Sequence, residues 1–382
     1  MPLYLDEDQT MLQDSVRPFI AEQAPPSHLR EFRDKNCKDG FSHDLWKQFG
    51  EMGFTGILAS EDDGGLGMGH VEAGVVLEEI GRNLTPSPFL VTSVAGVTAL
   101  SEAGAALREK YLPGIIAGET VLGIAIDEGA KHRPERIAMQ AERSGNGFKL
   151  SGKKQFVLQG GSADALIVAA RTGGSAGETQ GLTLFAVDKD ASGLSMESAR
   201  LVDSAMAAHI DFDGVEVTAD AVVGEVDQGW TVLRKVLAAT RVGSAAEMIG
   251  VGTGAMGMTV DYLKQRKQFG RLIGEFQALQ HRAAHLYGEL EIARAAVLKA
   301  QQLLDAAGSG DSEEAELWVS IAKAKAGAAC DLAVREGVQM HGGMGMTDEY
   351  DIGLYLKRDR ALAEFMGDSN YHANRVAELS GY

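Results

Sequence analysis

The sequence has few of the residues that build disulfide frameworks or membrane spans. Its 382 residues include only two cysteines, Cys37 and Cys330, which lie far apart in the chain. This number excludes a disulfide framework and a cysteine-based metal site. No apolar run approaches the ~20 residues that a membrane-spanning helix needs. The N-terminal stretch MPLYLDEDQT is acidic, whereas a signal peptide begins basic and then becomes apolar. We therefore expect a cytoplasmic protein with no membrane segment.

Basic residues are also scarce. The chain has 36 Lys and Arg against 54 Asp and Glu, which gives a net charge of −18 at pH 7. This charge argues against nucleic acid as a partner, because nothing would neutralise a line of phosphates. The nine histidines show no metal-ligand spacing such as HExxH, so we predict no metal site. A small anionic ligand stays compatible with the sequence where cations gather locally.

The period of the apolar residues divides the chain into three parts. Residues 1–118 show helical spacing, residues 119–226 show short strands with Gly, Asn and Asp turns, and residues 227–382 return to helix. Asn146-Gly147 is predicted to form a hairpin turn within the strand region. We therefore predict an α+β protein with an N-terminal helical domain, a middle β-barrel or sandwich domain and a C-terminal four-helix bundle.

Two capping signals and one long apolar stripe define helices within this plan. Ser42 is predicted to cap the helix that contains Leu45. Asp311 with Glu314 is predicted to form a capping box after Ser309-Gly310. The stripe alternates steps of three and four, as in a bundle helix. Its members are Phe276, Leu279, Ala283, Leu286, Leu290, Ala293, Val297, Ala300 and Leu304.

Two glycine clusters invite a nucleotide-binding interpretation that their surroundings oppose. GTGAMG at 252–257 matches G-x-G-x-x-G, but both flanks are helical, whereas a dinucleotide fingerprint follows a strand. We interpret these small residues as a close-packing surface between helices. GGLGMG at 64–69 has no βαβ unit around it and is predicted to be a loop.

Two other stretches combine glycines with residues that suit a phosphate or a planar ligand. RKQFGRLIGEFQ at 266–277 crowds cations beside two phenylalanines, and QMHGGMGMT at 339–347 contains a glycine-rich turn. Arginine suits bidentate contact with phosphate, and glycine lets the backbone approach a ligand closely. A solvated helix end and a plain connection between two helices are the structural alternatives.

Together these motifs resemble the acyl-CoA dehydrogenases, a flavoprotein family, over essentially the whole chain. The resemblance rests on RKQFG, FQALQH and QMHGG at their present spacing. It is closer still to the small subunits of heteromeric acyl-CoA dehydrogenases of the pimeloyl-CoA type, through GSADALIVAARTGG, YLKQRKQFG, HGGMGMTDEY and YLKRDRA. It implies an acyl-CoA dehydrogenase-like fold.

The resemblance implies FAD as the cofactor, shared between chains. One group of residues would hold the pyrophosphate and adenosine part of the FAD of a neighbouring subunit: Arg266, Gln268, Phe269, Phe276, Gln277, Gln339, His341, Gly342 and Gly343. The flavin ring would lie near Phe156 and Leu158 of the β-domain. The implied partners are an acyl-CoA substrate, an electron-transfer flavoprotein, and either a larger subunit or further copies of the chain as a dimer or tetramer.

The sequence departs from the family around the flavin. The usual Thr-Glu-Pro…Gly-Ser-Asp loop is IDEGAKHRPER here. The usual aromatic–x–Thr/Ser is Phe156-Val157-Leu158, so a hydroxyl hydrogen bond to the flavin is lost.

The position of the catalytic base is the largest departure. Most of the family places a Glu about eight residues after an Arg-Asp pair, and here that residue is Gly367. The family's other position, before the Arg of the first bundle helix, is Thr240. The acids nearby are Asp368, Glu364 and Glu247, of which Asp368 and Glu247 are the candidate bases. Arg241 is a candidate substrate contact, with a helix-face salt bridge as the alternative.

Three functions follow from these observations. The leading one is an FAD-dependent α,β-desaturation of an acyl-CoA thioester, in which the base comes from a larger partner subunit. The second is a non-catalytic subunit that completes a partner's FAD site. The third is an oxidase on the same fold.

Overall fold

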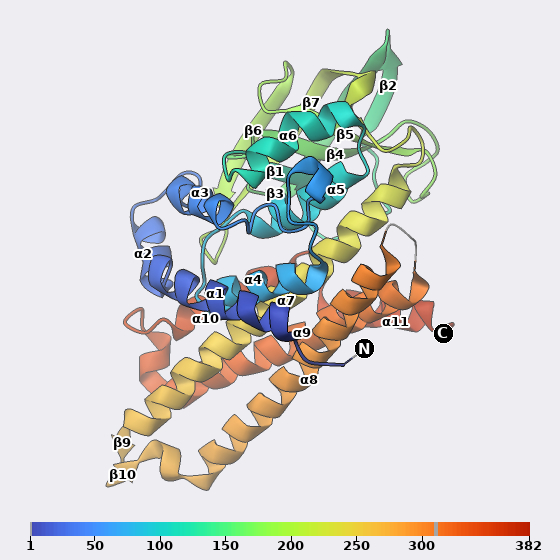
Figure 1. Cartoon of the computed structure of the whole chain (residues 1–382). Helices are drawn as coiled ribbons and strands as arrows, with labels where there is room; N and C mark the ends of the chain where they lie inside the picture. The colour runs from blue at the N-terminus through green and yellow to red at the C-terminus, as the bar shows by residue number, and fades with distance from the viewer. Residues whose placement is uncertain (1, 309–311) are drawn as a thin grey trace. The chain divides into compact units, whose positions relative to one another are not determined.

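The computed structural model describes residues 2–308 and 312–382 (Figure 1). They form two compact units, each built from separate stretches of sequence. The helical unit comprises Met1–Glu31, His70–Thr85 and Arg241–Tyr382, and the β unit comprises Phe32–Gly69 and Pro86–Thr240. Asp311, predicted to take part in a capping box, lies outside the described residues. Ser312 is the N-cap of the next helix, and its hydroxyl accepts the Ala315 N–H at 3.2 Å.

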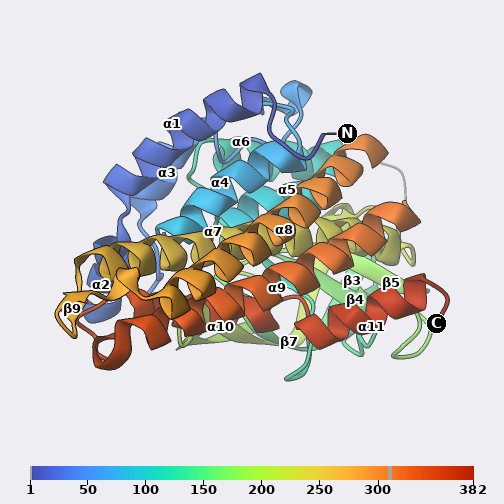
Figure 2. The same ribbon diagram turned by 90° about the horizontal axis from the view of Figure 1, so that it is seen from below.

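The helical unit contains the long helices of the C-terminal half. Its helices and the two short strands between α7 and α8 have these bounds: α1 (Glu7–Gln23), α4 (His70–Arg82), β9 (Lys267–Gln268), β10 (Arg271–Leu272), α8 (Gln277–Ala307), α9 (Glu313–His341), α10 (Ile352–Glu364) and α11 (Ser369–Leu379). The chain passes between the units within α2 (Pro26–Asp34) and α7 (Gly229–Gln265). Figure 2 shows α8, α9 and α11 side by side.

The predicted apolar stripe of α8 is buried along most of its length. Leu286, Leu290, Ala293 and Val297 are each at most 4% exposed. The stripe's first three residues, 276, 279 and 283, are only partly buried. The beginning of α8 therefore keeps apolar surface that the described part of this chain does not cover.

Glycines let α4 and α7 approach each other closely. A Cβ built on Gly250 would lie 1.9 Å from the carbonyl oxygen of Glu78, and one on Gly81 would lie 2.1 Å from that of Glu247. Within GTGAMG, a Cβ on Gly254 would lie 2.6 Å from the Arg82 carbonyl oxygen. The whole motif lies inside α7, so the packing interpretation is confirmed.

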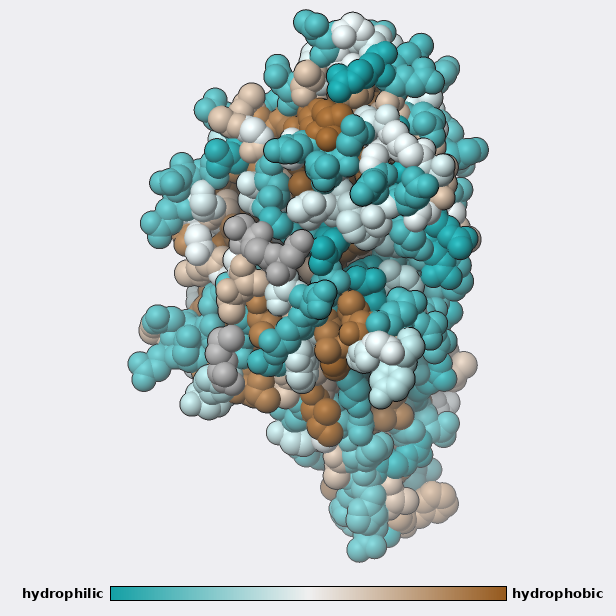
Figure 3. Space-filling view, turned by 90° about the vertical axis from the view of Figure 1, so that its right-hand side faces the viewer, coloured by the Kyte–Doolittle hydropathy of each residue, from teal (hydrophilic) through white to brown (hydrophobic). Residues whose placement is uncertain are grey.

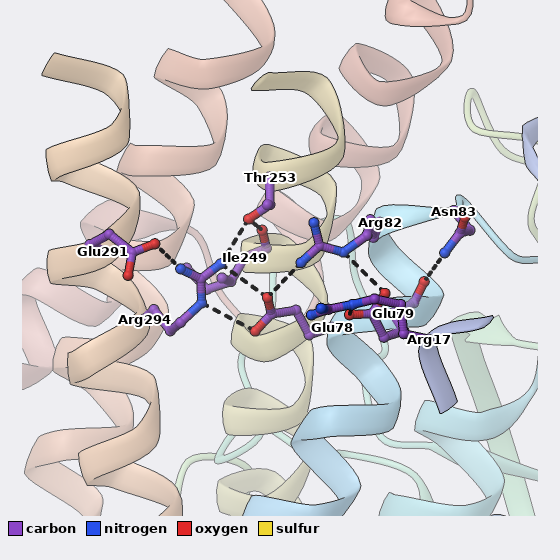
Figure 4. A network of polar contacts seen from close by, with 9 residues as sticks. All are labelled: Arg17, Glu78, Glu79, Arg82, Asn83, Ile249, Thr253, Glu291 and Arg294. Carbon is purple, nitrogen blue, oxygen red and sulfur yellow. Dashed lines mark hydrogen bonds and ion pairs between the residues drawn. The ribbon is translucent and has the colours of Figure 1, made fainter. Parts of the chain in front are cut away.

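Charged residues join the same helices into one network (Figure 4). Arg294 of α8 donates to both carboxylate oxygens of Glu78 on α4, at 3.0 and 3.3 Å, and to the Thr253 hydroxyl of α7 at 2.9 Å. Glu79, fully buried, accepts from Arg17 of α1 at 2.9 Å and pairs with Arg82 at 3.0 Å. The network ties α1 and α4 to the bundle helices α7 and α8.

The β unit contains, in the described part of the chain, an eight-stranded sheet. Its strands are β1 (Leu122–Ala125), β2 (Gln140–Ser144), β3 (Gly147–Leu158), β4 (Ala165–Arg171), β5 (Leu182–Asp188), β6 (Leu194–Arg200), β7 (Met206–Thr218) and β8 (Val222–Val223). Their order is β6-β7-β3-β2-β4-β5-β8, with β1 pairing parallel to β4. The unit's helices are α3 (His43–Glu51), α5 (Val97–Ser101) and α6 (Ala105–Ile116), with a π-helical stretch at Leu90–Gly96.

Two local predictions can be compared with this unit directly. The Ser42 hydroxyl accepts the Leu45 N–H at 3.2 Å, so the predicted cap is confirmed. The predicted hairpin turn at Asn146-Gly147 is wrong by one residue, because Gly147 already pairs with Ser144. The turn residues are Gly145 and Asn146, since Gly145 takes the positive φ of +56° that the turn requires.

The predicted α+β class, with helical, β and helical parts in that order, is confirmed. The face in Figure 3 is mostly hydrophilic, with small groups of apolar residues among polar ones. Within the described residues, no helix combines the length and the apolar character that a bilayer crossing requires.

Candidate functional site

A short hairpin carries the first predicted cofactor motif. Strands β9 and β10 pair through Gln268 with Arg271, and Phe269 and Gly270 form the turn with φ of +53° and +80°. Figure 1 shows this hairpin at the far end of α7, where α8 begins. A phenylalanine at positive φ is strained, and such strain is found where a residue must be presented in one direction. Phe269 is 92% exposed.

Cations and a second aromatic ring surround this turn. Arg266, Lys267 and Arg271 are all exposed, and none of them forms an ion pair with the described residues. The Arg271 guanidinium lies 3.9 Å from the centre of the Phe276 ring, and Phe269 meets that ring edge-on at 6.2 Å. The hairpin therefore presents positive charge and apolar rings together, a combination that suits a phosphate joined to a planar group.

The second motif lies at the end of α9. The helix ends at His341, and Gly342 takes a φ of +61°. Apart from its chain neighbours, no described residue has an atom within 4 Å of a Cβ built on Gly342 or Gly343, so the backbone here is open to a ligand. The His341 Nδ1 bonds the Gly337 carbonyl oxygen at 2.7 Å, and burial lowers the pKa of the ring. Because a carbonyl oxygen can only accept, Nδ1 carries a proton, and the lowered pKa favours the neutral ring.

An aromatic cluster brings the two motifs together. Tyr262, one turn before Arg266 on α7, stacks on His341 with ring centres 4.4 Å apart and planes at 26°. Tyr350 meets both rings edge-on, at 5.7 and 5.6 Å. The structure thus places the last turn of α7, just before the motif at 266–277, against His341 of the second motif. Gln268, Gln277 and Gln339 are exposed in this region.

The loop at the predicted base position is tightly folded. Met366 and Gly367 both have positive φ, +59° and +104°. A Cβ on Gly367 would lie 2.4 Å from Cδ1 of Tyr371 and 3.0 Å from Nε2 of His372. The tyrosine ring therefore fills the space into which a side chain at position 367 would project.

The candidate bases hold other partners. Asp368 is the N-cap of α11, and its carboxylate accepts the Tyr371 N–H at 2.7 Å. Glu247, 2% exposed, accepts from Arg358 of α10 at 2.5 and 2.8 Å. Glu364 is exposed and pairs with Arg360 at 3.2 Å. Thr240, at the other family position, donates to the Val236 carbonyl within its own helix.

Two buried cations hold the end of α10, and the sequence identified only one of them. Arg241 donates to the Met366 carbonyl at 3.3 Å and to the Tyr371 hydroxyl at 3.0 Å, and burial lowers its pKa. Lys323 donates to the Leu362 carbonyl at 2.8 Å, and burial lowers its pKa to about 8. Cations stabilise the carbonyl end of a helix. Lys323 was missed because SIAKAKAG looks like an ordinary solvated helix face.

In the β unit, the predicted flavin-contact residues lie on an irregular stretch of β3. The pairing of β3 with β7 shifts between Lys154 and Val157, which is typical of a β-bulge. On it Phe156 has a φ of +53°, is 49% exposed and lies 5.6 Å from the His209 ring. Leu158 is partly buried. The structure thus presents an aromatic ring at this position but no hydroxyl at residue 158.

The acids before this strand are bound within their own unit. Glu128 accepts the N–H groups of Ala138 and Met139, at 2.8 and 3.0 Å, and pairs with the fully buried Lys154 at 2.7 Å. Burial lowers the pKa of Lys154, against the opposing effect of Glu128. Sequence reasoning missed Lys154, because alternating strand residues such as KLSGKKQFVL do not show which lysine points inward.

Comparison with known proteins agrees with these features. The family descriptions that match are acyl-CoA dehydrogenase N-terminal domain over residues 6–119, middle domain over 127–215 and C-terminal domain over 227–380. The acyl-CoA dehydrogenase FadE12 of Mycobacterium tuberculosis is 31% identical over 93% of this chain and 91% of its own. The 3-(aryl)acrylate reductase of Clostridium sporogenes is 29% identical over 98% and 99%. A chain in the structure of the ChsE4-ChsE5 complex from M. tuberculosis matches with a TM-score of 0.88 at 25% identity. The match covers 100% of this chain and 100% of that chain.

The class of protein that this fold and these matches define is an oxidoreductase acting on CH–CH donors with FAD as cofactor. The chain belongs to the acyl-CoA dehydrogenase family. The predicted family is thereby confirmed, and the small-subunit branch within it stays a prediction.

The helical unit fits the adenosine diphosphate part of FAD. The open backbone at Gly342 and Gly343 leaves room for a ligand, and Arg266 supplies unpaired positive charge. The Nε2 atom of His341 is buried and has no hydrogen-bond partner among the described residues, so in the neutral ring it can accept from a hydroxyl or amino group but not from a phosphate. Phe269 and Phe276 would cover a planar ring. The assignment of these residues to the cofactor stays a prediction.

Proposed function

We propose that this chain is the small subunit of a heteromeric acyl-CoA dehydrogenase, of the pimeloyl-CoA type that it resembles. In this assembly its helical unit completes the FAD site of a larger partner, and the partner supplies the catalytic base. The observation that carries the proposal is the glycine at position 367, in a loop where the neighbouring carboxylates are already engaged.

Both chemistry and packing disfavour a catalytic base in this loop. Removal of an α proton from a thioester needs a carboxylate whose pKa approaches neutrality in a dry site. Asp368 instead accepts a backbone N–H at the start of α11, and Glu247 is held by an arginine. Both carboxylates are therefore already engaged as hydrogen-bond acceptors within this chain. Solved structures also support the proposal, since the ChsE4-ChsE5 structure is a complex of two different chains.

The geometry of the helical unit supports a role for three of its residues. FAD, when bound, supplies the acceptor for the hydride released from the β carbon, and an electron-transfer flavoprotein would take the electrons onward. Arg266 would bind the pyrophosphate, Phe269 would cover the adenine and the Nε2 atom of His341 would accept a hydrogen bond from the adenosine part. Phe269 is 92% exposed, and within the described residues Arg266 forms no ion pair and the Nε2 atom of His341 has no hydrogen-bond partner.

Co-expression tests the proposal. A tagged copy of this chain is purified alone and with the products of neighbouring genes, and each sample is assayed anaerobically for acyl-CoA-dependent bleaching of the flavin. We expect the chain alone to turn over poorly and the two-chain complex to be yellow and active. A purified homo-oligomer with brisk turnover that Asp368→Asn abolishes would overturn the proposal and make Asp368 the base. Rapid peroxide formation in air would point to an oxidase instead.

The cofactor arm gives a separate prediction. Arg266→Ala is expected to remove FAD from the complex, because it deletes the cation proposed to bind the pyrophosphate. Arg335→Ala is the matched control, since Arg335 is exposed on α9 and pairs with Asp331. The ratio of absorbance at 450 nm to that at 280 nm measures flavin content. Full flavin occupancy in Arg266→Ala would contradict the assignment.

A further inference from the structure

One cationic segment of the β unit has no role in the function proposed above. Residues 131–136 read KHRPER, within the stretch that replaces the family's Thr-Glu-Pro…Gly-Ser-Asp loop. The whole chain has 54 acidic residues against 36 basic ones, whereas this segment has three Lys and Arg against one Glu. Lys131, Arg133 and Arg136 are all exposed.

The backbone that carries these cations is fixed at several points. The Arg136 N–H donates to the Arg133 carbonyl at 2.9 Å, which closes a turn with one arginine at each end. The Arg133 N–H donates to Asp127 at 3.1 Å, and the Gly177 N–H donates to the Glu135 carbonyl at 3.1 Å. The two arginine side chains therefore start from a well-held scaffold.

The acids at the base of the segment do not neutralise these arginines. Asp127 also accepts from His132 at 2.8 Å, and Glu128 is engaged by two backbone N–H groups and Lys154. Arg133 and Arg136 form no ion pair or side-chain hydrogen bond with the described residues, Glu135 between them included. The result is an anchored turn with two free guanidinium groups.

We propose that Arg133 and Arg136 bind the phosphate groups of a coenzyme A thioester. The first and fourth residues of a turn have Cα atoms within about 7 Å of each other, so their guanidinium groups can meet on one phosphate. Each guanidinium matches two phosphate oxygens. On a chain of net charge −18, a polyanionic substrate needs such a local group of cations. The identity of the ligand rests on the proposed function, whose substrate is an acyl-CoA.

Isothermal titration of the purified chain and of the co-expressed complex tests this site. The probes are coenzyme A, 3′-dephospho-coenzyme A and inorganic phosphate. We compare the wild type with Arg133→Gln/Arg136→Gln and with the control Arg335→Gln/Arg360→Gln, which removes the same charge from exposed arginines of α9 and α10. Circular dichroism shows whether each variant is folded.

We expect the Arg133/Arg136 variant to raise the Kd for coenzyme A at least tenfold, with the control unchanged. If the difference between coenzyme A and its 3′-dephospho form disappears in the variant, the 3′-phosphate is the group bound. If the variant binds coenzyme A and 3′-dephospho-coenzyme A more weakly by the same factor, the turn binds the pyrophosphate. An unchanged Kd, or a wild type that does not bind coenzyme A, overturns the proposal. Loss of the partner chain at unchanged Kd would assign the turn to a protein interface instead. None of these results depends on which chain supplies the base.

Discussion

Both the backbone conformation and the packing at position 367 favour glycine, which cannot act as a base. The φ of +104° suits glycine, and the Tyr371 ring occupies the space beside its Cα. Arg241 holds that ring through the tyrosine hydroxyl. The loop therefore opposes a side chain at 367 both through its conformation and through packing.

Gly367→Ala is expected to lower the free energy of unfolding by about 2–4 kcal/mol, because it adds backbone strain and an overpacked contact. Gly353→Ala is the control, since Gly353 lies in α10 with no atom within 4 Å of a Cβ. Helix propensity predicts that the control is neutral or stabilising by up to about 1 kcal/mol. Urea denaturation measures both, and equal stability of the two variants would contradict the steric account.

The second residue-scale prediction concerns Lys323, which is 2% exposed. Burial lowers its pKa from 10.5 to about 8. Because the folded pKa lies below the unfolded one, the unfolded state binds the proton more tightly between these pH values. The contribution of Lys323 to stability is therefore full above pH 10.5 and is lost as the pH falls to 8.

Lys323→Met removes this titration. The free energy of unfolding of the wild type, relative to the variant, should rise by about 3 kcal/mol between pH 8 and pH 10.5. Urea denaturation at a series of pH values gives this difference. Parallel pH profiles for the two proteins would show that the lysine is not held in a desolvated site.

Some of the residues in the candidate site could be predicted from the sequence, and others could not. The hairpin and the glycine turn could be found because their residue types are unusual for a helix connection. Asp368 also carried a readable signal, since an Asp directly before a helical run is a common N-cap. The burial of Lys323 could not be predicted, because its partner carbonyl lies 39 residues further along and comes close only through packing.

At the scale of elements, α4 joins the bundle through close glycine contacts and through the charged network of Figure 4. The type and order of the helices followed from apolar periodicity. The charged network could not be predicted from periodicity, because Glu78 and Arg294 are separated by 216 residues. Pairing over such a distance depends on how helices cross, which local pattern does not specify.

Arg294→Met is expected to destabilise the protein by about 1–3 kcal/mol, because it leaves Glu78 without its bidentate partner. The side chains of this pair are 30% and 15% exposed. Arg335→Met is the control, because the side chains of Arg335 and Asp331 are 69% and 42% exposed. Exposed pairs contribute about 0–1 kcal/mol. Equal losses in the two variants would show that the network adds no more than a surface pair.

At the scale of the whole molecule, the two units differ in how well they suit FAD. The helical unit offers open glycines and cations that form no ion pair with the described residues, whereas the β unit has Leu158 in place of a hydroxyl and has Glu128 engaged by Lys154. We therefore expect the proposed complex to carry one FAD for each pair of chains. Flavin absorbance of the denatured complex, with protein determined by amino-acid analysis, gives this ratio. A ratio of one FAD per chain would show that the β unit holds a flavin as well.

The phenyl ring at the tip of the β9–β10 hairpin has a consequence for how the chain behaves before it is assembled. Phe269 is 92% exposed, so folding of this chain alone gains almost no free energy from burial of this ring. Full burial of such a ring by another chain is worth about 2 kcal/mol, or roughly a thirtyfold change in a dissociation constant. The exposed ring also promotes aggregation of the isolated chain, so yield and solubility should improve when its partner is produced in the same cell.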